Sequence, residues 1–267
     1  MPAAQRCGQK TQLMPPRGVL LQDLTWIEAQ SHLSEQSLVV IPLGASAKEH
    51  GPHLRLDNDW TLAQYFAGRV LAAAEVVMIP TVGYHYYPAF VDYPGSVTLR
   101  LETARDLIVD ICASLAAFGP RRFYVLNTGV STLRPLSAAA DVLAKTGLLL
   151  RYTDLRTLAA DVVRRCSEQA GGTHADEIET SVMLYIAPER VDMRKAVCDY
   201  HPGTGPLTRD PQAQGTYSAS GVYGDATLAS WDKGRDVAEA IVTGMLSEIE
   251  RLRGEGLPPA RGHGTAV

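Results

Sequence analysis

The chain has 267 residues, of which 46% are apolar and 20% are charged, and its formal net charge is −4. This composition supports a folded core and excludes a disordered acidic tail, a coiled coil and a collagen-like repeat. The weak charge disfavours a dedicated nucleic-acid binder, and no apolar run approaches the roughly 20 residues that span a bilayer. The four cysteines are far apart and form no CxxC pair, which predicts reduced thiols in a cytoplasmic protein.

Both ends of the chain differ in composition from its middle. Residues 1–18 are polar and rich in Pro and Gln, which predicts a flexible N-terminal arm without the apolar core of a signal peptide. Residues 254–267 contain several Gly and Pro residues and predict a flexible C-terminal tail. No linker interrupts residues 19–253, so we expect them to form a single domain.

Short apolar runs alternate with longer segments of helical periodicity. The expected elements, in chain order, are a strand at 38–43, a helix at 59–74, strands at 76–79 and 96–101, a helix at 103–118, a strand at 123–126, a helix at 134–145, a strand at 148–152, and helices at 154–165, from about 176, and at 231–253. This order favours an α/β fold with a mostly parallel sheet covered on both faces. Sites in such sheets lie outside the carboxyl ends of the strands, so the residues after Leu43, Ile79 and Leu126 become candidates.

The segment after the first of these strands is dense in groups that bind metals. Glu49, His50, His53, Asp57 and Asp59 lie within eleven residues, and imidazole and carboxylate are ligands that zinc and manganese accept. Taken singly, an Asp before a helix is an ordinary N-cap, and a His at a strand end is usually hydrogen-bonded in the core. Glu, His, His and Asp together at the carboxyl end of a strand favour a metal site.

The run Glu49-His50-Gly51-Pro52-His53-Leu54, with Asp59 nine residues after His50, resembles the creatininase (creatinine amidohydrolase) family, whose motif reads E-Q-H-G-P-H-L-P followed by T-D. The resemblance implies a three-layer α/β/α sandwich, a site for two zinc or manganese ions, hydrolysis of C–N bonds in small amides, and a homo-oligomer. It also implies that His50 and Asp59 are metal ligands, with Asp59 bridging. The family glutamate stands two residues before the first His, where this chain has Lys48. The stretch from Pro42 to His50 is one residue longer than in the family, so we carry the role over to Glu49, which we expect a bulge to bring inward as a metal ligand.

Two later segments extend the resemblance. The run from His174 to Ser181 resembles the family segment H-A-G-x-x-E-T-S, which implies that His174 relays protons to the leaving nitrogen and that Glu179 supports the site. Independently, Glu179 lies beside an apolar helical stripe, where a carboxylate is costly unless it is paired or bound to a metal. The aromatic loop at 84–96 resembles the loop that closes with F-P-G-T. It is either pinned by packed tyrosines or a pocket wall, and on the second reading His85 and Tyr87 contact substrate, together with His53 from the first loop.

The segment after the strand at 123–126 departs from the family pattern. The family has N-G-H-G-G-N or N-G-H-Y-E-N there, with the His and the Glu as ligands, whereas this chain has Gly129 and Ser131 at those positions. One metal is thus short of ligands, so the site holds one ion, borrows a residue from elsewhere, or binds none. Ser131 is expected to contact substrate instead, and the small residues before a helix offer N–H groups to an anion.

The leading hypothesis is a metal-dependent amidohydrolase in which metal-activated water attacks a small amide and His174 protonates the leaving nitrogen. The alternative is a non-catalytic or metal-free creatininase-like protein that binds a small polar metabolite. Diverging side chains of His50 and Asp59, or an ion pair from Lys48 or Arg55 to Asp59 across the site, would decide for the alternative. A nucleotide-binding enzyme lacks support because no GxGxxG or phosphate-loop motif follows a strand.

Overall fold

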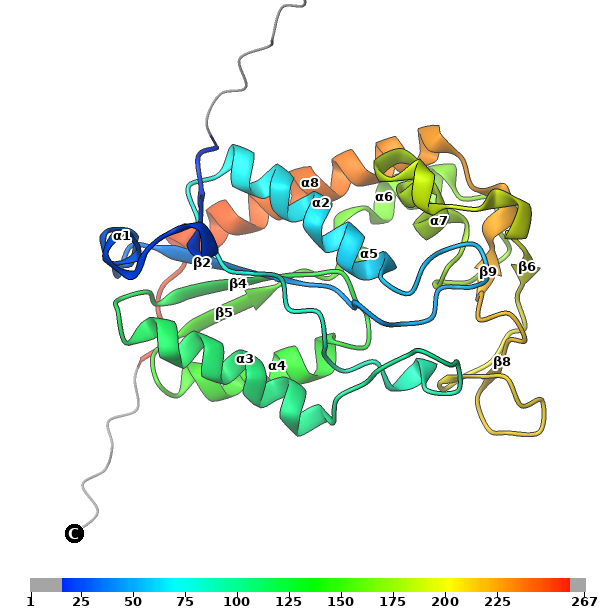
Figure 1. Cartoon of the computed structure of the whole chain (residues 1–267), viewed down its shortest axis with the longest axis horizontal. Helices are drawn as coiled ribbons and strands as arrows, with labels where there is room; N and C mark the ends of the chain where they lie inside the picture. The colour runs from blue at the N-terminus through cyan, green and yellow to red at the C-terminus, as the bar shows by residue number, and fades with distance from the viewer. Residues whose placement is uncertain (1–15, 260–267) are drawn as a thin grey trace, which may run out of the picture.

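The computed structural model describes residues 16–259 and is built around one parallel sheet (Figure 1). Its five strands lie in the order β1-β3-β2-β4-β5, and all their pairings are parallel. The strands are β1 (Val19–Leu20), β2 (Leu38–Leu43), β3 (Val77–Met78), β4 (Arg122–Asn127) and β5 (Leu149–Tyr152). The central strands β2 and β4 have apolar residues on both faces, as strands covered on both sides require.

Helices cover both faces of the sheet. They are α1 (Trp26–His32), α2 (Asn58–Ala73), α3 (Leu101–Ala116), α4 (Leu133–Ala144), α5 (Leu155–Leu158), α6 (Ala160–Cys166), α7 (Glu177–Ile186) and α8 (Trp231–Gly254). Val40 of β2 points to a core shared with α2, α7 and α8, and its neighbour Val39 points to a core shared with α3 and α4. Figure 1 shows α2 and α8 on one side of the sheet and α3 and α4 on the other. The expected three-layer α/β/α architecture is therefore confirmed.

The loops beyond the sheet contain short elements. Two small two-stranded sheets pair β6 (Cys198–Asp199) with β9 (Gly224–Asp225) and β7 (Leu207–Thr208) with β8 (Thr216–Tyr217). The 3-10 turns are Leu21–Asp23, Pro88–Phe90, Pro188–Arg190, Met193–Lys195 and Ala226–Leu228.

Two expected elements differ in the structure. The strand expected at 96–101 does not form, because Val97 donates to the Ala47 carbonyl and Leu99 to the His85 carbonyl, and these single bonds to two loops build no ladder. The helix expected at 154–165 is divided into α5 and α6 at Ala159, whose backbone leaves the helical region with φ −113° and ψ 12°.

The described residues extend past both expected limits of the domain, residues 19 and 253. Gly18 is already buried and donates to the Leu71 carbonyl at 2.9 Å, so the folded body starts before residue 19. At the other end α8 includes Gly254, and Leu257 packs against the core. Residues 1–15 and 260–267 lie outside the described part, so the flexibility expected of both termini stays a prediction.

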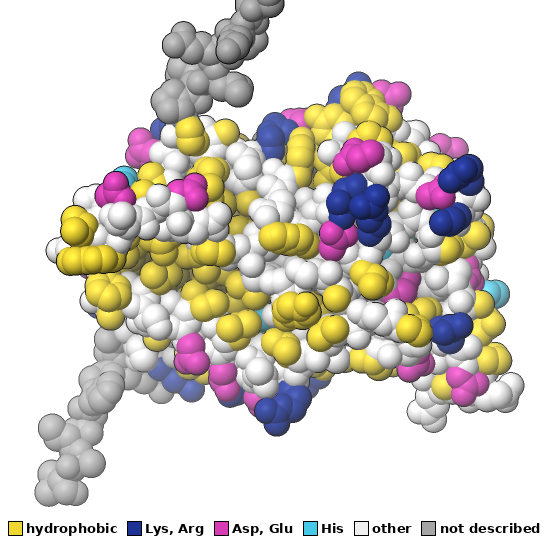
Figure 2. All heavy atoms as spheres, in the orientation of Figure 1, with side chains coloured by type: hydrophobic (Ala, Val, Ile, Leu, Met, Phe, Trp, Pro, Cys, Tyr) yellow, Lys and Arg dark blue, Asp and Glu magenta, His cyan; other side chains and the backbone are white. Residues whose placement is uncertain are grey.

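The described surface has one apolar end. Figure 2 shows hydrophobic side chains gathered at the end of the molecule that carries α1, where Trp26 and Ile27 are 77% and 63% exposed. None of the helices within residues 16–259 combines the length and apolarity that crossing a bilayer requires.

Candidate active site

The loop between β2 and α2 crosses the carboxyl edge of the sheet with its side chains on alternating sides. Lys48 and His50 point toward Asp59 at the start of α2, whereas Glu49 between them points toward His174. The backbone is held on both sides, because the Lys48 N–H donates to the Leu56 carbonyl and the Glu49 N–H donates to Ser96 Oγ, both at 2.9 Å. Alternation along an extended segment thus decides which charges meet.

Asp59 is the buried centre of this loop, with 1% of its surface exposed. Its Oδ2 lies 2.7 Å from Lys48 Nζ, and its Oδ1 lies 2.9 Å from His50 Nε2. Burial alone would raise the pKa of Asp59, but Lys48 and His50 outweigh it and hold the pKa well below its usual range. Asp59 is therefore an ionised carboxylate between two nitrogen groups.

The hydrogen-bond partners of both His50 nitrogens require a positive charge on the ring or next to it. Nδ1 lies 2.9 Å from the Lys48 carbonyl, so Nδ1 is the donor there. Nε2 lies 2.9 Å from Asp59 Oδ1 and 3.4 Å from Glu179 Oε1, and both oxygens are acceptors. Because a neutral imidazole has only one N–H, this arrangement needs either a doubly protonated ring or a cation between Nε2 and the carboxylates.

Glu179, in the first turn of α7, joins the two histidines. Its Oε1 accepts from Asn58 Nδ2 at 2.9 Å, and its Oε2 accepts from the Ala175 N–H at 2.8 Å. The same Oε2 lies 3.8 Å from His174 Nδ1. One ligand atom from each of His50, His174 and Glu179 lies within 4.8 Å of the others, so these three side chains could hold a metal ion.

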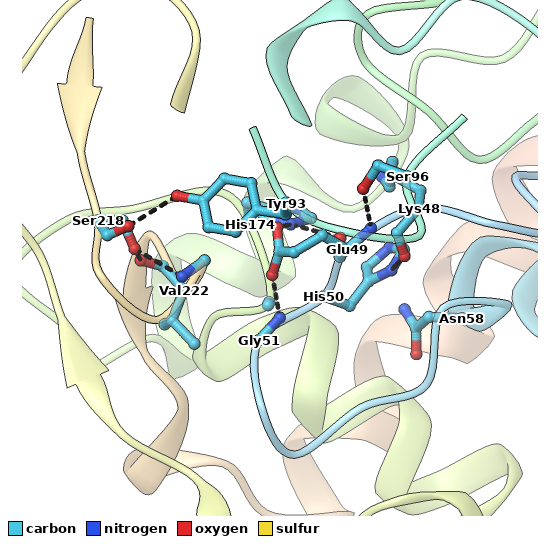
Figure 3. A network of polar contacts seen from close by, with 12 residues as sticks. Lys48, Glu49, His50, Gly51, Asn58, Tyr93, Ser96, His174, Ser218 and Val222 are labelled. Carbon is cyan, nitrogen blue, oxygen red and sulfur yellow. Dashed lines mark hydrogen bonds and ion pairs between the residues drawn. The ribbon is translucent and has the colours of Figure 1, made fainter. Parts of the chain in front are cut away.

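Glu49 fixes the His174 ring from the opposite side (Figure 3). His174 Nε2 donates to Glu49 Oε2 at 3.0 Å and to the Glu49 carbonyl at 2.9 Å, and the Gly51 N–H donates to Glu49 Oε1. Burial favours the neutral acid, yet His174 and Gly51 lower the pKa of Glu49, so this carboxylate is ionised. Because Nε2 carries the proton, Nδ1 is the nitrogen of His174 that remains available.

Two backbone features make this arrangement fit. Gly221 has φ +86°, and a Cβ at this position would collide with the Glu49 carboxylate. Ala175 has φ +47°, the one positive value among the described non-glycine residues, and this conformation directs its N–H at Glu179. Left-handed backbone at a non-glycine residue costs roughly 1–3 kcal/mol and is typically kept at functional sites.

The loop after β4 carries no charged group. Asn127 Nδ2 donates to the Gly129 carbonyl at 2.6 Å, and Asn127 Oδ1 accepts from Thr132 Oγ1 at 2.6 Å. A Cβ on Gly129 would come within 3.1 Å of Thr132 and 3.5 Å of the Tyr87 ring. The loop therefore satisfies its own polar groups, and Thr132 and Tyr87 bound the space beside Gly129.

A cavity of about 760 Å³ opens onto these groups. Its polar wall near the edge of the sheet includes Lys48, Asp59, Ser131, His174 and Glu179. Much of the remaining wall is apolar and comes from Leu62, Phe66, Tyr87, Phe90, Leu155, Ala159, Val163, Val182, Val237 and Ile241. The cavity is large enough for a small organic molecule.

The comparisons with known proteins agree with one another. The family model described as "Creatininase: Creatinine amidohydrolase" matches residues 22–249. The chain belongs to the creatininase family.

Three curated relatives of this chain are named as hydrolases or peptidases. The mycofactocin precursor peptide peptidase of Mycolicibacterium smegmatis is 28% identical, covering 80% of this chain and 85% of that protein. The 3-dehydro-scyllo-inosose hydrolase of Thermotoga maritima is 26% identical, covering 92% and 88%. The creatinine amidohydrolase of Pseudomonas putida is 26% identical, covering 91% and 99%. These relatives confirm the expected class, an amidohydrolase-type hydrolase.

Solved creatininases share the fold. The structure titled "Creatininase Mn" superposes with a TM-score of 0.74 at 23% identity, over 89% of this chain and 100% of that one. A mutant creatininase of "Zn-Zn type" gives a TM-score of 0.73 at 23% identity, over 89% and 99%. At this identity the likeness establishes the creatininase fold, and the ions are those of the solved proteins.

The creatininase fold brings four of the predicted site residues together. His50, Asp59, His174 and Glu179 converge at the carboxyl edge of the sheet, as expected. Tyr87 and Ser131 line the cavity, and the buried Tyr87 hydroxyl has no hydrogen-bond partner among the described residues.

Three other predicted residues, Glu49, His53 and His85, make contacts other than those expected. The expected bulge at Glu49 is absent, and its carboxylate binds His174 and Gly51 instead of joining Asp59. His53 lies 2.8 Å from Thr180 Oγ1 and borders a different surface hollow. His85 is wholly buried against the Ala104 carbonyl at 3.0 Å and does not line the cavity. Burial lowers the pKa values of His53 and His85 to about 4, which suits neutral structural rings.

Sequence reasoning missed three contributors to the site. Asn58 lies beside Asp59, and its amide donates to Glu179. The ring of Phe90 packs against His174 with 4.4 Å between centroids, and Gly221 makes room for Glu49. The aromatic richness of the loop at 84–96 was the available signal for Phe90, whereas nothing local marked the other two.

Proposed function

We propose that the chain hydrolyses a C–N bond of a small linear or cyclic amide, with one divalent metal ion and with His174 as the proton donor. The observation that carries this proposal is the convergence of two carboxylates on His50 Nε2, with Asp59 Oδ1 at 2.9 Å and Glu179 Oε1 at 3.4 Å. Both acidic residues and the neighbouring His174 line the cavity. Family membership supports the reaction class, since the named relatives are hydrolases and a peptidase.

His174 is suited to proton transfer because its second nitrogen is already engaged. Glu49 accepts from Nε2, so Nδ1 is the atom that can receive a proton and deliver it to a departing nitrogen. Packing against Phe90 and the bonds from Glu49 leave the ring one orientation. This preorganisation means that the proton need not wait for a side-chain rotation.

The metal ligands we propose are His50, Asp59 and Glu179. These side chains present nitrogen and oxygen atoms that suit zinc or manganese, and the acceptors around His50 Nε2 require positive charge at this point. The chemistry that such an ion supplies is the activation of water and of a substrate carbonyl. Asn58 and the Ala175 N–H orient Glu179 from behind, as groups around metal ligands commonly do.

Two further residues that line the cavity are the substrate contacts that we propose. They are Tyr87, whose hydroxyl has no hydrogen-bond partner within residues 16–259, and Ser131. Creatinine is not the substrate that we propose, because the loop containing Gly129 and Ser131 departs from the family pattern. The extensive apolar wall favours an amide that carries an apolar group.

Metal analysis of the purified protein tests this function. Wild type is expected to retain zinc or manganese and to hydrolyse a member of a panel of cyclic and linear amides, while His50→Ala loses both the metal and the activity. His174→Gln is expected to keep the metal and lose activity by a factor of about 10²–10⁴. Absence of zinc and manganese from the wild type, with unchanged metal content in His50→Ala, would disprove the proposal.

A second candidate is a metal-free protein that binds a small polar metabolite. The observation that favours it is the ion pair from Lys48 to Asp59, whereas Arg55 is exposed and forms no ion pair with any described residue. This ion pair meets one of the two criteria stated for this candidate, whereas the convergence of His50 and Asp59 does not meet the other. Family membership and the relatives named as hydrolases support the hydrolase. Tight metabolite binding that survives chelation, without hydrolysis, would select this candidate.

Two further expectations remain proposals. We propose a homo-oligomer, supported by the exposed Trp26 and Ile27 on α1, and light scattering at several concentrations measures it. We also propose a cytoplasmic location, supported by the free thiols of the described Cys112, Cys166 and Cys198, and fractionation of cells that express the protein tests it.

A further inference from the structure

Lys48 is buried in a place where a lysine is costly. Only 5% of it is exposed, and its Nζ lies 2.7 Å from Asp59 Oδ2, an oxygen without another hydrogen-bond donor in the described part of the chain. The same Nζ stands 4.7 Å from the centre of the Phe90 ring and 5.8 Å from that of Tyr87. Aromatic faces attract cations, so three neighbours hold the ammonium in one position.

The two oxygens of Asp59 face different partners. Oδ1 points to His50 and, beyond it, to Glu179, which together offer nitrogen and oxygen ligands. Oδ2 points to Lys48, and the nearby loop after β4 offers only Gly129 and Ser131, which bring neither imidazole nor carboxylate. A divalent ion at Oδ2 would stand beside a fixed positive charge, and like charges repel strongly in a buried site.

The loop after β4 leaves little room for a larger side chain at position 129. Thr132 and Tyr87 lie within 3.1 Å and 3.5 Å of the position that a Cβ on Gly129 would take. Compared with the family motif, this chain has the cationic Lys48 in place of a carboxylate and lacks metal ligands at positions 129 and 131. Both differences remove ligands from the surroundings of Asp59 Oδ2, and the first also adds a positive charge there.

We propose that the ammonium of Lys48 occupies one of two cation positions on Asp59, so that the chain binds one divalent ion per site. The remaining position is the Oδ1 side, with His50 and Glu179. This inference rests on the proposed function for the identity of that remaining ion. The role of Lys48 itself rests on the ion pair and can be tested separately.

The test counts zinc and manganese ions bound per chain, by titration calorimetry and by elemental analysis after dialysis. Wild type is expected to bind one equivalent. In Lys48→Glu/Gly129→His the ammonium is removed and two ligands are supplied, so a second equivalent is expected. The matched control Arg55→Glu/Gly129→His has the same charge change on the same loop and the same new histidine, but it keeps Lys48 and is expected to stay at one.

The outcomes separate the two proposals. Two equivalents in wild type, or a double variant that folds and still binds no more than wild type, would overturn the role of Lys48. No ion in wild type but uptake by Lys48→Glu/Gly129→His would overturn the metal-dependent function and leave the role of Lys48 standing. Circular dichroism checks folding, and Lys48→Glu alone, also expected to gain metal, replaces the double variant if histidine at 129 prevents folding.

Discussion

The loops after β2 and β4 start from paired residues, Leu43 and Asn127, yet the first carries buried charged side chains and the second carries none. The first loop buries Lys48, Glu49 and His50. Lys48 and His50 find partners in α2 and α7, and Glu49 pairs with His174, which precedes α7. The second contains no charge between Asn127 and Thr132 and satisfies its polar groups within itself. Position at the carboxyl edge of a parallel sheet therefore gives a loop access to the site, but the side chains decide whether it contributes chemistry.

The largest expected effect comes from removing the charge that balances Asp59. Lys48→Met leaves a buried carboxylate without its ammonium, and breaking a buried ion pair from one side costs about 3–5 kcal/mol. The free energy of unfolding should fall by this amount in urea titrations at pH 7 with EDTA, which prevents a metal from replacing the ammonium. Arg55→Met, on the exposed side of the same loop, should change it by less than about 0.5 kcal/mol. A loss below about 1 kcal/mol in Lys48→Met would contradict the central role assigned to this pair.

The loop after β3 supplies a pH test, because it buries His85 without using it in the cavity. Burial lowers the pKa of His85 to about 4, although the bond to the Ala104 carbonyl partly opposes this. Unfolded histidine binds its proton near pH 6.5, so between about pH 6.5 and 4 the unfolded state holds more protons than the folded state. As the pH decreases from about 6.5 to 4, the free energy of unfolding should therefore decrease by about 3 kcal/mol because of His85 alone. His85→Gln should flatten the measured profile by that amount, and a profile parallel to wild type would refute the assignment.

Gly221 tests how the first loop depends on a distant segment. Gly221→Ala places a methyl group on a residue with φ +86° and against the Glu49 carboxylate. We expect a loss of about 2 kcal/mol from the strained backbone, together with release of His174 from Glu49. Gly68→Ala on α2, where a Cβ meets nothing within 4 Å, should instead gain about 0.5–1 kcal/mol. Thermal unfolding of the pair measures this contrast, which disappears if the backbone at 221 relaxes freely.

The smallest expected effect concerns the second loop. Thr132→Val keeps the shape of the side chain but removes the hydroxyl that donates to Asn127 Oδ1 and the Gly129 carbonyl. Since the Gly129 N–H still donates to Asn127 Oδ1 at 3.2 Å, the loss should be about 1 kcal/mol. Metal content should stay unchanged, and a drop in bound metal on this substitution would show that the uncharged loop does contribute to the ion site.

The sequence was informative where local pattern decides structure. The apolar run at 38–43 and the periodic helix starting near residue 59 appear as β2 and α2. Strand β1 has two residues, Val19–Leu20, and exists because it pairs with β3, so no local period could reveal it. The extended run at 96–101 looked like a strand, but only a neighbouring strand could have made it one.

The candidate site was predictable in membership more than in wiring. The histidine and acidic residues after the strand at 38–43 pointed to the carboxyl edge of the sheet, and the family resemblance added His174 and Glu179. His50, Asp59, His174 and Glu179 do lie together there. Which of the adjacent Lys48 and Glu49 faces Asp59 depends on the alternation of an extended loop, and a shift of one residue reverses it. That choice is made by bonds to Leu56 and Ser96, which are distant in the loop or in the chain.

The left-handed Ala175 ties His174, the proposed proton donor, to the start of a helix. His174 precedes it, and Asp176 follows it as the N-cap of α7, accepting from the Ile178 and Glu179 N–H groups at 3.0 Å and 2.9 Å. Fraying of this first turn and displacement of the His174 ring are therefore a single opening event. Amide hydrogen exchange at Ile178 and Glu179 should then report how often the first turn of α7 opens in the native protein, and with it the arrangement of His174 and Glu179.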